Sequence, residues 1–142
     1  MRVMVVGASG AIGTRLVPQL TGRGHEVIGT FKSPGNAERV RALGAEPVAL
    51  DLLDPGAARR AVLEARPEGI IHQATALAGA GFSRKLDKTF AETNRLRTEG
   101  TDALLAAAAS SRWIHEVTPP PSPITGYHRL RTSRTTTSLA AP

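Results

Sequence analysis

The stretch "VVGASGAIGTRL" (residues 5–16) places Gly7, Gly10 and Gly13 at intervals of three directly behind a run of valines. An apolar run that ends in glycine is typical of a strand buried on both faces, followed by a tight turn. The residues after the last glycine carry apolar side chains four apart, as one side of a helix does. The stretch therefore predicts a strand, a glycine-rich turn and a helix.

Each glycine has a separate role in this arrangement. Gly7 can take the turn off the strand, Gly10 lets a diphosphate approach the main chain, and Gly13 lets the helix pack closely on the sheet. The N–H groups at the helix start, with the positive end of the helix dipole, would face that anion. Three turn glycines without a ligand are the alternative, and the strand-to-helix context favours the anion site.

The first 117 residues continue in the same rhythm of short apolar segments and helical ones. Strands are expected at 2–7, 25–31, 45–50, 68–74 and 112–117, and helices at 11–24, 34–44, 55–67 and about 86–109. This rhythm predicts right-handed crossovers and helices on both faces of a parallel sheet. The expected fold is α/β, a Rossmann-like doubly wound sheet with strand order 3-2-1-4-5. Residues 1–117 would form one domain, truncated at one sheet edge.

Residues 118–142 differ in character from the rest. They are rich in Pro and Thr, carry no acid and show almost no apolar periodicity. Such a segment cannot bury enough surface to offset its ordering entropy, so a disordered tail is expected.

Composition restricts the class of protein. The chain of 142 residues has no cysteine, and its apolar runs are too short for a membrane span or a signal peptide. The net charge of +6 is scattered and has no interleaved aromatic residues, which argues against a nucleic-acid partner. A cytoplasmic protein without membrane association is expected.

Residues 1 to about 109 resemble the extended short-chain dehydrogenase/reductases, the NAD-dependent epimerase/dehydratase group. The glycine spacing is that of this family, and "ALDLLD", "IIHQATA" and "TNRLRTEGTDALLAAA" match three further segments. The resemblance implies a dinucleotide cofactor and places Asp51 at the adenine amino group and the His-x-Ala segment beside the nicotinamide ribose. The cofactor contacts that it implies are Gly7, Ser9, Gly10, Ala11, Ile12, Gly13, Lys32, Ser33, Asp51, Leu52, Ala74, Thr75 and Ala76.

Several of these residues have a second interpretation. Asp51 could be a solvated loop acid, and His72 is interpreted as a satisfied core histidine rather than a catalyst. Asn94 stands at the family's active-site asparagine and, with Leu86 and Phe90 at four-residue spacing, is expected to face inward. A satisfied structural amide is the alternative for Asn94.

The end of the second strand bears on the choice between NAD and NADP. NAD-preferring members carry an acid there, whereas this chain has Phe31, followed by Lys32 and Ser33. A cation and a hydroxyl could bind a 2′-phosphate, which favours NADP. A solvated Lys32 and a helix-capping Ser33 are the alternative.

The family's catalytic Tyr and Lys, four residues apart, have no good match. Tyr127 is followed by Arg131, in the expected tail, and the upstream serines are Ser110, Ser111 and Ser122. Tyr127 is therefore not expected to be a catalyst, and the chain alone is expected to be inactive. A reading-frame shift near residues 107–112 would explain the change in character, and a genuine short variant is the alternative.

Three functions are compatible with these patterns. The chain is expected to be an NAD(P)-binding domain whose intact relatives are oxidoreductases, epimerases or dehydratases of sugar nucleotides or of small carbonyl or hydroxyl compounds. A non-catalytic nucleotide sensor and a non-functional fragment are the alternatives. The substrate is unknown, and the fifth strand, as an open edge, could support self-association.

Overall fold

The structure is a computed structural model that describes residues 1–54, 56–76, 86–118 and 130–131, with only the backbone at 86–89 and 130–131. Within this part of the chain a central sheet has its strands in the order β3-β2-β1-β4-β5-β6. The first five strands are parallel, which confirms the predicted order, and β6 is antiparallel to β5. The bounds are β1 (Arg2–Val6), β2 (Glu26–Phe31), β3 (Glu46–Ala49), β4 (Gly69–His72), β5 (Glu116–Thr118) and β6 (Leu130–Arg131).

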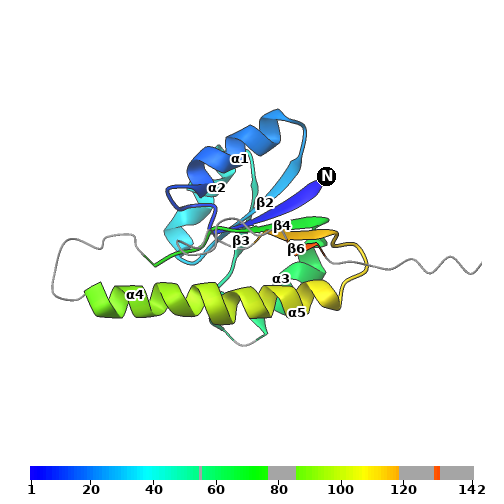
Figure 1. The fold of residues 1–142 in the computed structure, drawn as a ribbon. Coiled ribbons are helices and arrows are strands. Elements are labelled where there is room, and N and C mark those ends of the chain that lie inside the picture. Colours follow the sequence, from blue (N-terminus) through cyan, green and yellow to red (C-terminus); the bar gives the residue numbers. More distant parts are fainter. Residues whose placement is uncertain (55, 77–85, 119–129, 132–142) are drawn as a thin grey trace, which may run out of the picture.

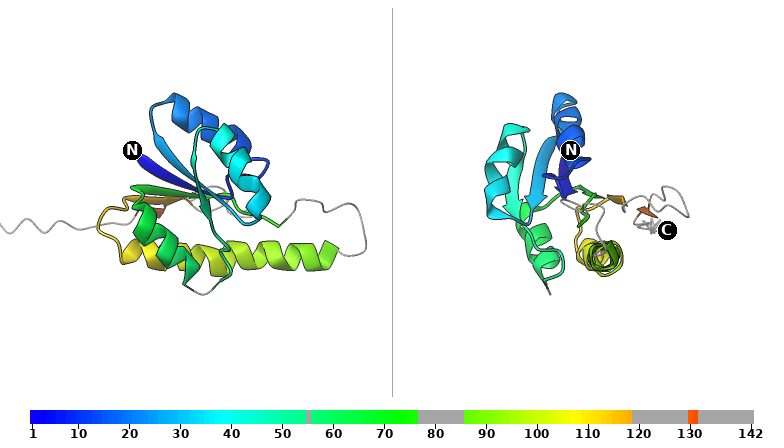
Figure 2. Two further views of the ribbon diagram at one scale, coloured as in Figure 1. Left: turned by 180° about the vertical axis from the view of Figure 1, so that it is seen from behind. Right: turned by 90° about the vertical axis from the view of Figure 1, so that its left-hand side faces the viewer.

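Helices cover both faces of the sheet (Figure 1). The views from behind and from the side (Figure 2) place α1 and α2 on one face, and α3 and a long helix made of α4, η2 and α5 on the other. The long helix contains a π-helical turn, η2, between α4 and α5. The bounds are α1 (Gly13–Gly22), the 3₁₀ turn η1 (Pro34–Asn36), α2 (Ala37–Ala42), α3 (Ala57–Ala65), α4 (Leu86–Arg95), η2 (Leu96–Gly100) and α5 (Thr101–Ala109).

The central strand β1 shows why the sheet needs both layers. Its side chains alternate between the faces, and all of Val3, Met4, Val5 and Val6 are buried. Val3 and Val5 belong to the apolar cluster that includes α1 and α2, whereas Met4 and Val6 belong to the cluster that includes α3 and α5. A continuous apolar run is therefore the sequence pattern of a strand covered on both sides.

Arg2 joins the amino ends of several strands. Its guanidinium forms ion pairs with Glu26 of β2 and Glu46 of β3, and its Nε donates to the carbonyl of Ala65, 2.6 Å away. Its backbone N–H donates to the carboxylate of Glu68, which precedes β4. These contacts hold the end of the sheet opposite to the glycine-rich turn.

The fifth strand begins later than the sequence predicts. Residues 112–115 lie outside β5, because Glu116 is in register with Gly69, the first residue of β4. The residues before Glu116 therefore extend beyond the start of β4, and the backbone N–H of His115 donates to the carbonyl of Glu68 instead.

Part of the expected disordered tail forms a strand. Leu130 pairs with Val117 and Arg131 with Glu116, so β5 is not the outermost strand, contrary to the prediction of an open edge there. β6 has no signal in the sequence, because a two-residue antiparallel strand has no periodicity of its own. The rest of the tail, 119–129 and 132–142, lies outside the described residues, and its disorder stays a prediction.

His72 connects the sheet to the π-helical turn. The side chain is fully buried at the end of β4, and its Nε2 donates to the carbonyl of Leu96, 2.9 Å away. Its Nδ1 accepts the backbone N–H of Ala74 at 3.3 Å, which assigns the proton to Nε2. Both nitrogens have partners, so this geometry agrees with the interpretation of His72 as a satisfied core histidine.

Burial lowers the pKa of His72, and the charge of Arg97 lowers it further, against the opposing hydrogen bond to Leu96. In the unfolded chain the imidazole takes up a proton near its ordinary pKa of 6.5, whereas in the folded chain it stays neutral. Because the unfolded state then binds more protons, His72 contributes a loss of stability as the pH falls below 6.5.

We expect His72→Gln to remove this contribution, which is at most about 1.4 kcal/mol per pH unit. The measurement is urea unfolding of the parent and the variant between about pH 7.5 and pH 5.5, bracketing the ordinary imidazole pKa. The free energy of unfolding of the parent should fall more steeply with decreasing pH. Equal pH dependence in the two proteins would contradict the role of His72.

Candidate functional site

The carboxyl ends of β1, β2, β3 and β4 meet at one edge of the sheet, where the glycine-rich turn lies. In open parallel sheets this edge is where ligands bind, because loops and helix starts converge there. Most of the residues singled out in the sequence come from the segments that follow these four strands. We refer to this region, which comprises residues 7–13 after β1, 32–33 after β2, 50–53 after β3 and 73–76 after β4, as the mouth.

Gly7 makes the turn off β1 possible in two ways. Its φ is +88°, a conformation that favours glycine, and an added Cβ would lie only 2.7 Å from Cα of Ala74. Its N–H donates to Oγ1 of Thr30 at 3.1 Å, and the N–H of Ala8 donates to the carbonyl of the same threonine. The turn is thus held between the ends of β2 and β4.

The other two glycines bring the start of α1 onto this turn. An added Cβ at Gly13 would lie 2.5 Å from the carbonyl oxygens of Gly7 and Ala8, so the first residue of the helix packs directly on the turn. At Gly10 it would lie 3.2 Å from the Gly7 carbonyl oxygen, and Gly10 is exposed. The backbone of the turn can therefore be approached closely from the solvent side.

The start of α1 is suited to an anion. Its N-cap residue, Ile12, makes no side-chain capping bond, and the first turn of the helix contains no acid. Ile12 is half exposed, and Ser9 and Ala11 lie between the glycines with partial or full exposure. The positive end of this helix dipole is thus not neutralised by a carboxylate of its own first turn.

Asp51 and Leu52 follow β3 at the mouth. One oxygen of Asp51, Oδ1, accepts the backbone N–H of Leu53 at 3.1 Å, which orients the carboxylate. The side chain of Leu52 is buried in the core and approaches Gly100 of the long helix, where an added Cβ would lie 2.6 Å from it. Leu52 can therefore offer a ligand its main chain but not its side chain.

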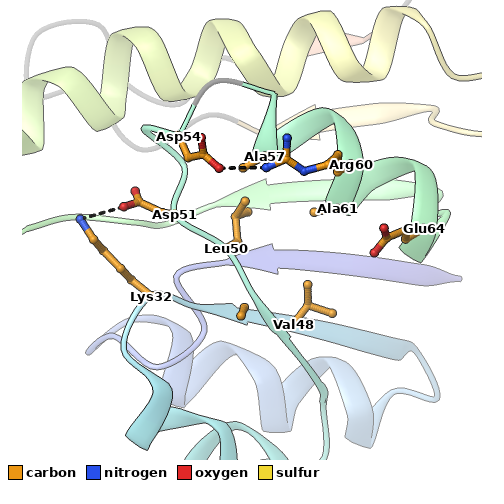
Figure 3. Close-up of a pocket in the computed structure, with 10 residues that line it drawn as sticks. Lys32, Val48, Leu50, Asp51, Asp54, Ala57, Arg60, Ala61 and Glu64 are labelled. Atoms are coloured by element: carbon orange, nitrogen blue, oxygen red, sulfur yellow. Dashed lines mark hydrogen bonds and ion pairs between the residues drawn. The ribbon is translucent and has the colours of Figure 1, made fainter.

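Lys32, just after β2, lies between two carboxylates. Its Nζ is 3.4 Å from Oδ2 of Asp51 (Figure 3) and 3.3 Å from Oε1 of Glu92, which belongs to α4. Burial opposes the ammonium charge, but the hydrogen bonds and charges of Glu92 and Asp51 outweigh it and raise the pKa of Lys32. The sequence gives no sign of Glu92 at this site, because the contact joins residues 60 positions apart in the chain.

Two predictions concern the residues on either side of Lys32, which are Phe31, the last residue of β2, and Ser33. Phe31 is buried, so an apolar side chain occupies the end of β2, where the family resemblance led us to expect an acid in NAD-preferring members. Ser33 precedes the 3₁₀ turn as its N-cap residue, but its hydroxyl makes no capping bond. The exposed Ser33 hydroxyl therefore stands beside Lys32 in the sequence without the role of a helix cap.

A hollow of about 270 Å³ adjoins the mouth at Lys32 and Asp51 and extends along β3 beneath α3 (Figure 3). An ion pair between Arg60 and Asp54 lies at its border, with 2.8 Å between Nη2 and Oδ2. No residue of the glycine turn lines the hollow. It therefore belongs to the β3 side of the mouth and not to the glycine turn.

The segment after β4 passes between the glycine turn and the long helix. Ala74 lies against Gly7, Thr75 is exposed, and the N–H of Ala76 donates to Oγ1 of Thr93 at 3.1 Å. Thr93 is buried and was missed in the sequence. The signal that could have found it is the spacing of three and four residues that it shares with Leu96 and Gly100.

The prediction that Asn94 faces inward is wrong in this structure. Asn94 is exposed, Phe90 is 50% exposed, and the buried position of this turn is Thr93. The four-residue spacing of residues 86, 90 and 94 does define one side of the helix, but the side that carries Thr93 is the buried one. The family role of Asn94 at an active site stays a prediction.

Of the serine, tyrosine and arginine residues considered for catalysis, the structure describes only two serines with their side chains, and neither lies at the mouth. Ser110 and Ser111 directly follow α5, and both hydroxyls donate to the carbonyl of Ala107 at 2.8 Å, before β5 begins. They lie toward the amino end of that strand, away from the glycine turn. Tyr127 and Ser122 lie outside the described residues, and the side chain of Arg131 is not described.

The described part of the chain contains neither a candidate metal site nor a candidate membrane-spanning helix. In residues 1–54, 56–76, 86–118 and 130–131 there is no group of three His, Asp or Glu side chains that could hold a metal ion. Over the same residues, the helices are too short or too polar to cross a membrane.

Comparison with known proteins agrees with this geometry. The NAD dependent epimerase/dehydratase family model matches residues 3–118. A 3-diazoavenalumate denitrifying reductase from a Streptomyces species is 42% identical over 111 residues, which cover 78% of this chain and 34% of the relative. A ketoreductase of a farnesylated dihydroquinoline oxide from Stigmatella aurantiaca is 35% identical over 79% of this chain and 31% of its own length.

Solved structures of epimerases are also similar to this chain. The UDP-glucose 4-epimerase of Thermus thermophilus, in complex with NAD, has a TM-score of 0.60 and 29% identity over 76% of this chain and 33% of its own. The UDP-glucose 4-epimerase of Stenotrophomonas maltophila, also with bound NAD, has a TM-score of 0.56 and 27% identity over 77% of this chain and 33% of its own. This chain spans about one third of the length of these relatives. Together with the parallel sheet and its glycine turn, the match over residues 3–118 shows that the chain belongs to the NAD dependent epimerase/dehydratase family.

Proposed function

We propose that this chain binds a nicotinamide dinucleotide across the mouth, with the diphosphate over the glycine turn. The observation that carries the proposal is the contact of the turn with the start of α1, whose first helical turn holds no acid and no side-chain cap. Gly10 is exposed and has no side chain, so a diphosphate would have access to the backbone of the turn. Family membership and the NAD-bound relatives support the same ligand.

The remaining contacts follow the order of the strand ends. Asp51 and the main chain of Leu52 would hold the adenine, and the segment after β4 would lie beside the nicotinamide ribose. Lys32 and Ser33 would lie nearest the adenine ribose. The full proposed set is Gly7, Ser9, Gly10, Ala11, Ile12, Gly13, Lys32, Ser33, Asp51, Leu52, Ala74, Thr75 and Ala76.

The bound dinucleotide would supply hydride transfer, and this chain would bind and orient it. We further propose that the chain alone does not turn over a substrate, which is unassigned. The support is that Ser110 and Ser111 follow α5, away from the glycine turn, and that no described side chain supplies a Tyr–Lys pair at the mouth. A cofactor-sensing module and a non-functional fragment are the alternatives. Cofactor titration distinguishes the fragment, and a turnover assay distinguishes an enzyme from a sensor.

The location of the protein in the cell and its self-association both stay predictions from the sequence. One is a cytoplasmic location. The other is self-association through the open side of the sheet, now with β6 in place of β5 as the outermost strand.

Gly10→Val tests dinucleotide binding. We expect calorimetric affinity for NAD or NADP to fall by about tenfold or more, because a branched side chain would stand where the diphosphate lies. The matched control is Gly22→Val at the other end of α1, where an added Cβ meets nothing within 4 Å. The proposal fails if Gly10→Val, shown to be folded by circular dichroism, binds dinucleotide as tightly as the parent.

We also propose that NADP binds more tightly than NAD. The support is the buried Phe31 in place of an acid, the position of Lys32, and the Ser33 hydroxyl, which makes no capping bond. The expected preference is about 1–2 kcal/mol, the range of a charge-assisted hydrogen bond. Lys32→Ala should narrow this preference in calorimetry with NADP and NAD, and tighter binding of NAD by the parent would overturn it.

A further inference from the structure

Glu92 reaches the mouth from an unexpected direction. It belongs to α4, on the face of the sheet opposite to α1 and α2, and its Oε1 accepts a hydrogen bond from Lys32 Nζ at 3.3 Å. Its side chain is about half exposed, so solvent and ligands have access to it. The strand-end positions from which cofactor preference is inferred do not include this residue.

The three side chains form a small charged cluster. Lys32 is shared between Asp51 and Glu92, so one positive charge faces two negative ones, and the cluster carries a net charge of −1. The hydrogen bonds and charges of the two carboxylates also raise the pKa of Lys32. A 2′-phosphate arriving at Lys32 would have to share the ammonium with both acids and would meet their repulsion.

The two acids are not equivalent. Asp51 also accepts the N–H of Leu53, which orients it within its own loop, and the family resemblance assigns it to the adenine. Glu92 stands on a separate element, and its hydrogen bond runs to the one cation that the proposed NADP site uses. Although β2 ends in Phe31 and not in an acid, a carboxylate from the long helix still lies beside Lys32.

We infer that Glu92 is a specificity-determining residue that holds Lys32 and repels a 2′-phosphate, and so limits the preference for NADP over NAD. This inference rests on the proposed dinucleotide binding. Lys32 and Glu92 act in opposite directions on the same phosphate. The cofactor preference of the chain is set by the balance between the end of β2 and the side of α4.

The test compares Glu92→Gln with the parent chain in calorimetric titrations with NADP and NAD. We expect the variant to bind NADP about threefold more tightly, the scale of an exposed ion pair, and to bind NAD with little change. The matched control is Glu99→Gln on the same long helix, whose carboxylate pairs with Arg95 instead. This control should leave both affinities unchanged.

Adenosine 2′,5′-bisphosphate and AMP, titrated in the same way, isolate the ribose end of the ligand. The gain from Glu92→Gln should appear with the bisphosphate, should be small with AMP, and should shrink as salt is raised from about 0.05 M to 0.5 M. An unchanged ratio of NADP to NAD affinity, or a ratio that moves toward NAD, would overturn the inference alone. Absence of dinucleotide binding by the parent would overturn the proposed function with it.

Discussion

The close approach of three backbone segments at the glycine turn is the constraint on which the site depends. Added Cβ atoms at Gly7 and Gly13 would lie 2.7 Å and 2.5 Å from main-chain atoms of neighbouring segments, distances that real Cβ atoms essentially never show. Main-chain atoms cannot move away as a flexible side chain can, so larger residues would displace β4 or α1. The same contacts bring the start of α1 to the carboxyl edge of the sheet.

The mouth gains its chemical character from elements on both faces of the sheet. The glycine turn and α1 provide an uncapped helix start, and Lys32 follows the neighbouring strand β2. The long helix on the other face adds Thr93, which orients the segment after β4, and Glu92, which binds Lys32. A ligand in the mouth would therefore contact both layers at once.

Much of the fold could be predicted because it follows from local patterns. The apolar run of β1, the glycine after it and the alternation of strands and helices depend on neighbouring residues, and the structure confirms the strand order. The side of the long helix that packs inward could not be read in the same way. Two sides of that helix have three- and four-residue spacing, and tertiary packing selects Thr93 rather than Asn94. The position of β5 depends on the register with β4, and β6 exists only through its pairing with β5.

The contacts of Arg2 have a practical consequence for work with this chain. The carbonyl of Met1 accepts the backbone N–H of Glu26, and Arg2 is tied to the amino ends of the neighbouring strands, so the first two residues have little slack. A peptide fused ahead of Met1 would leave the molecule at the amino edge of the sheet, the full length of β1 away from the glycine turn. Immobilisation through such a fusion would present the mouth to solution.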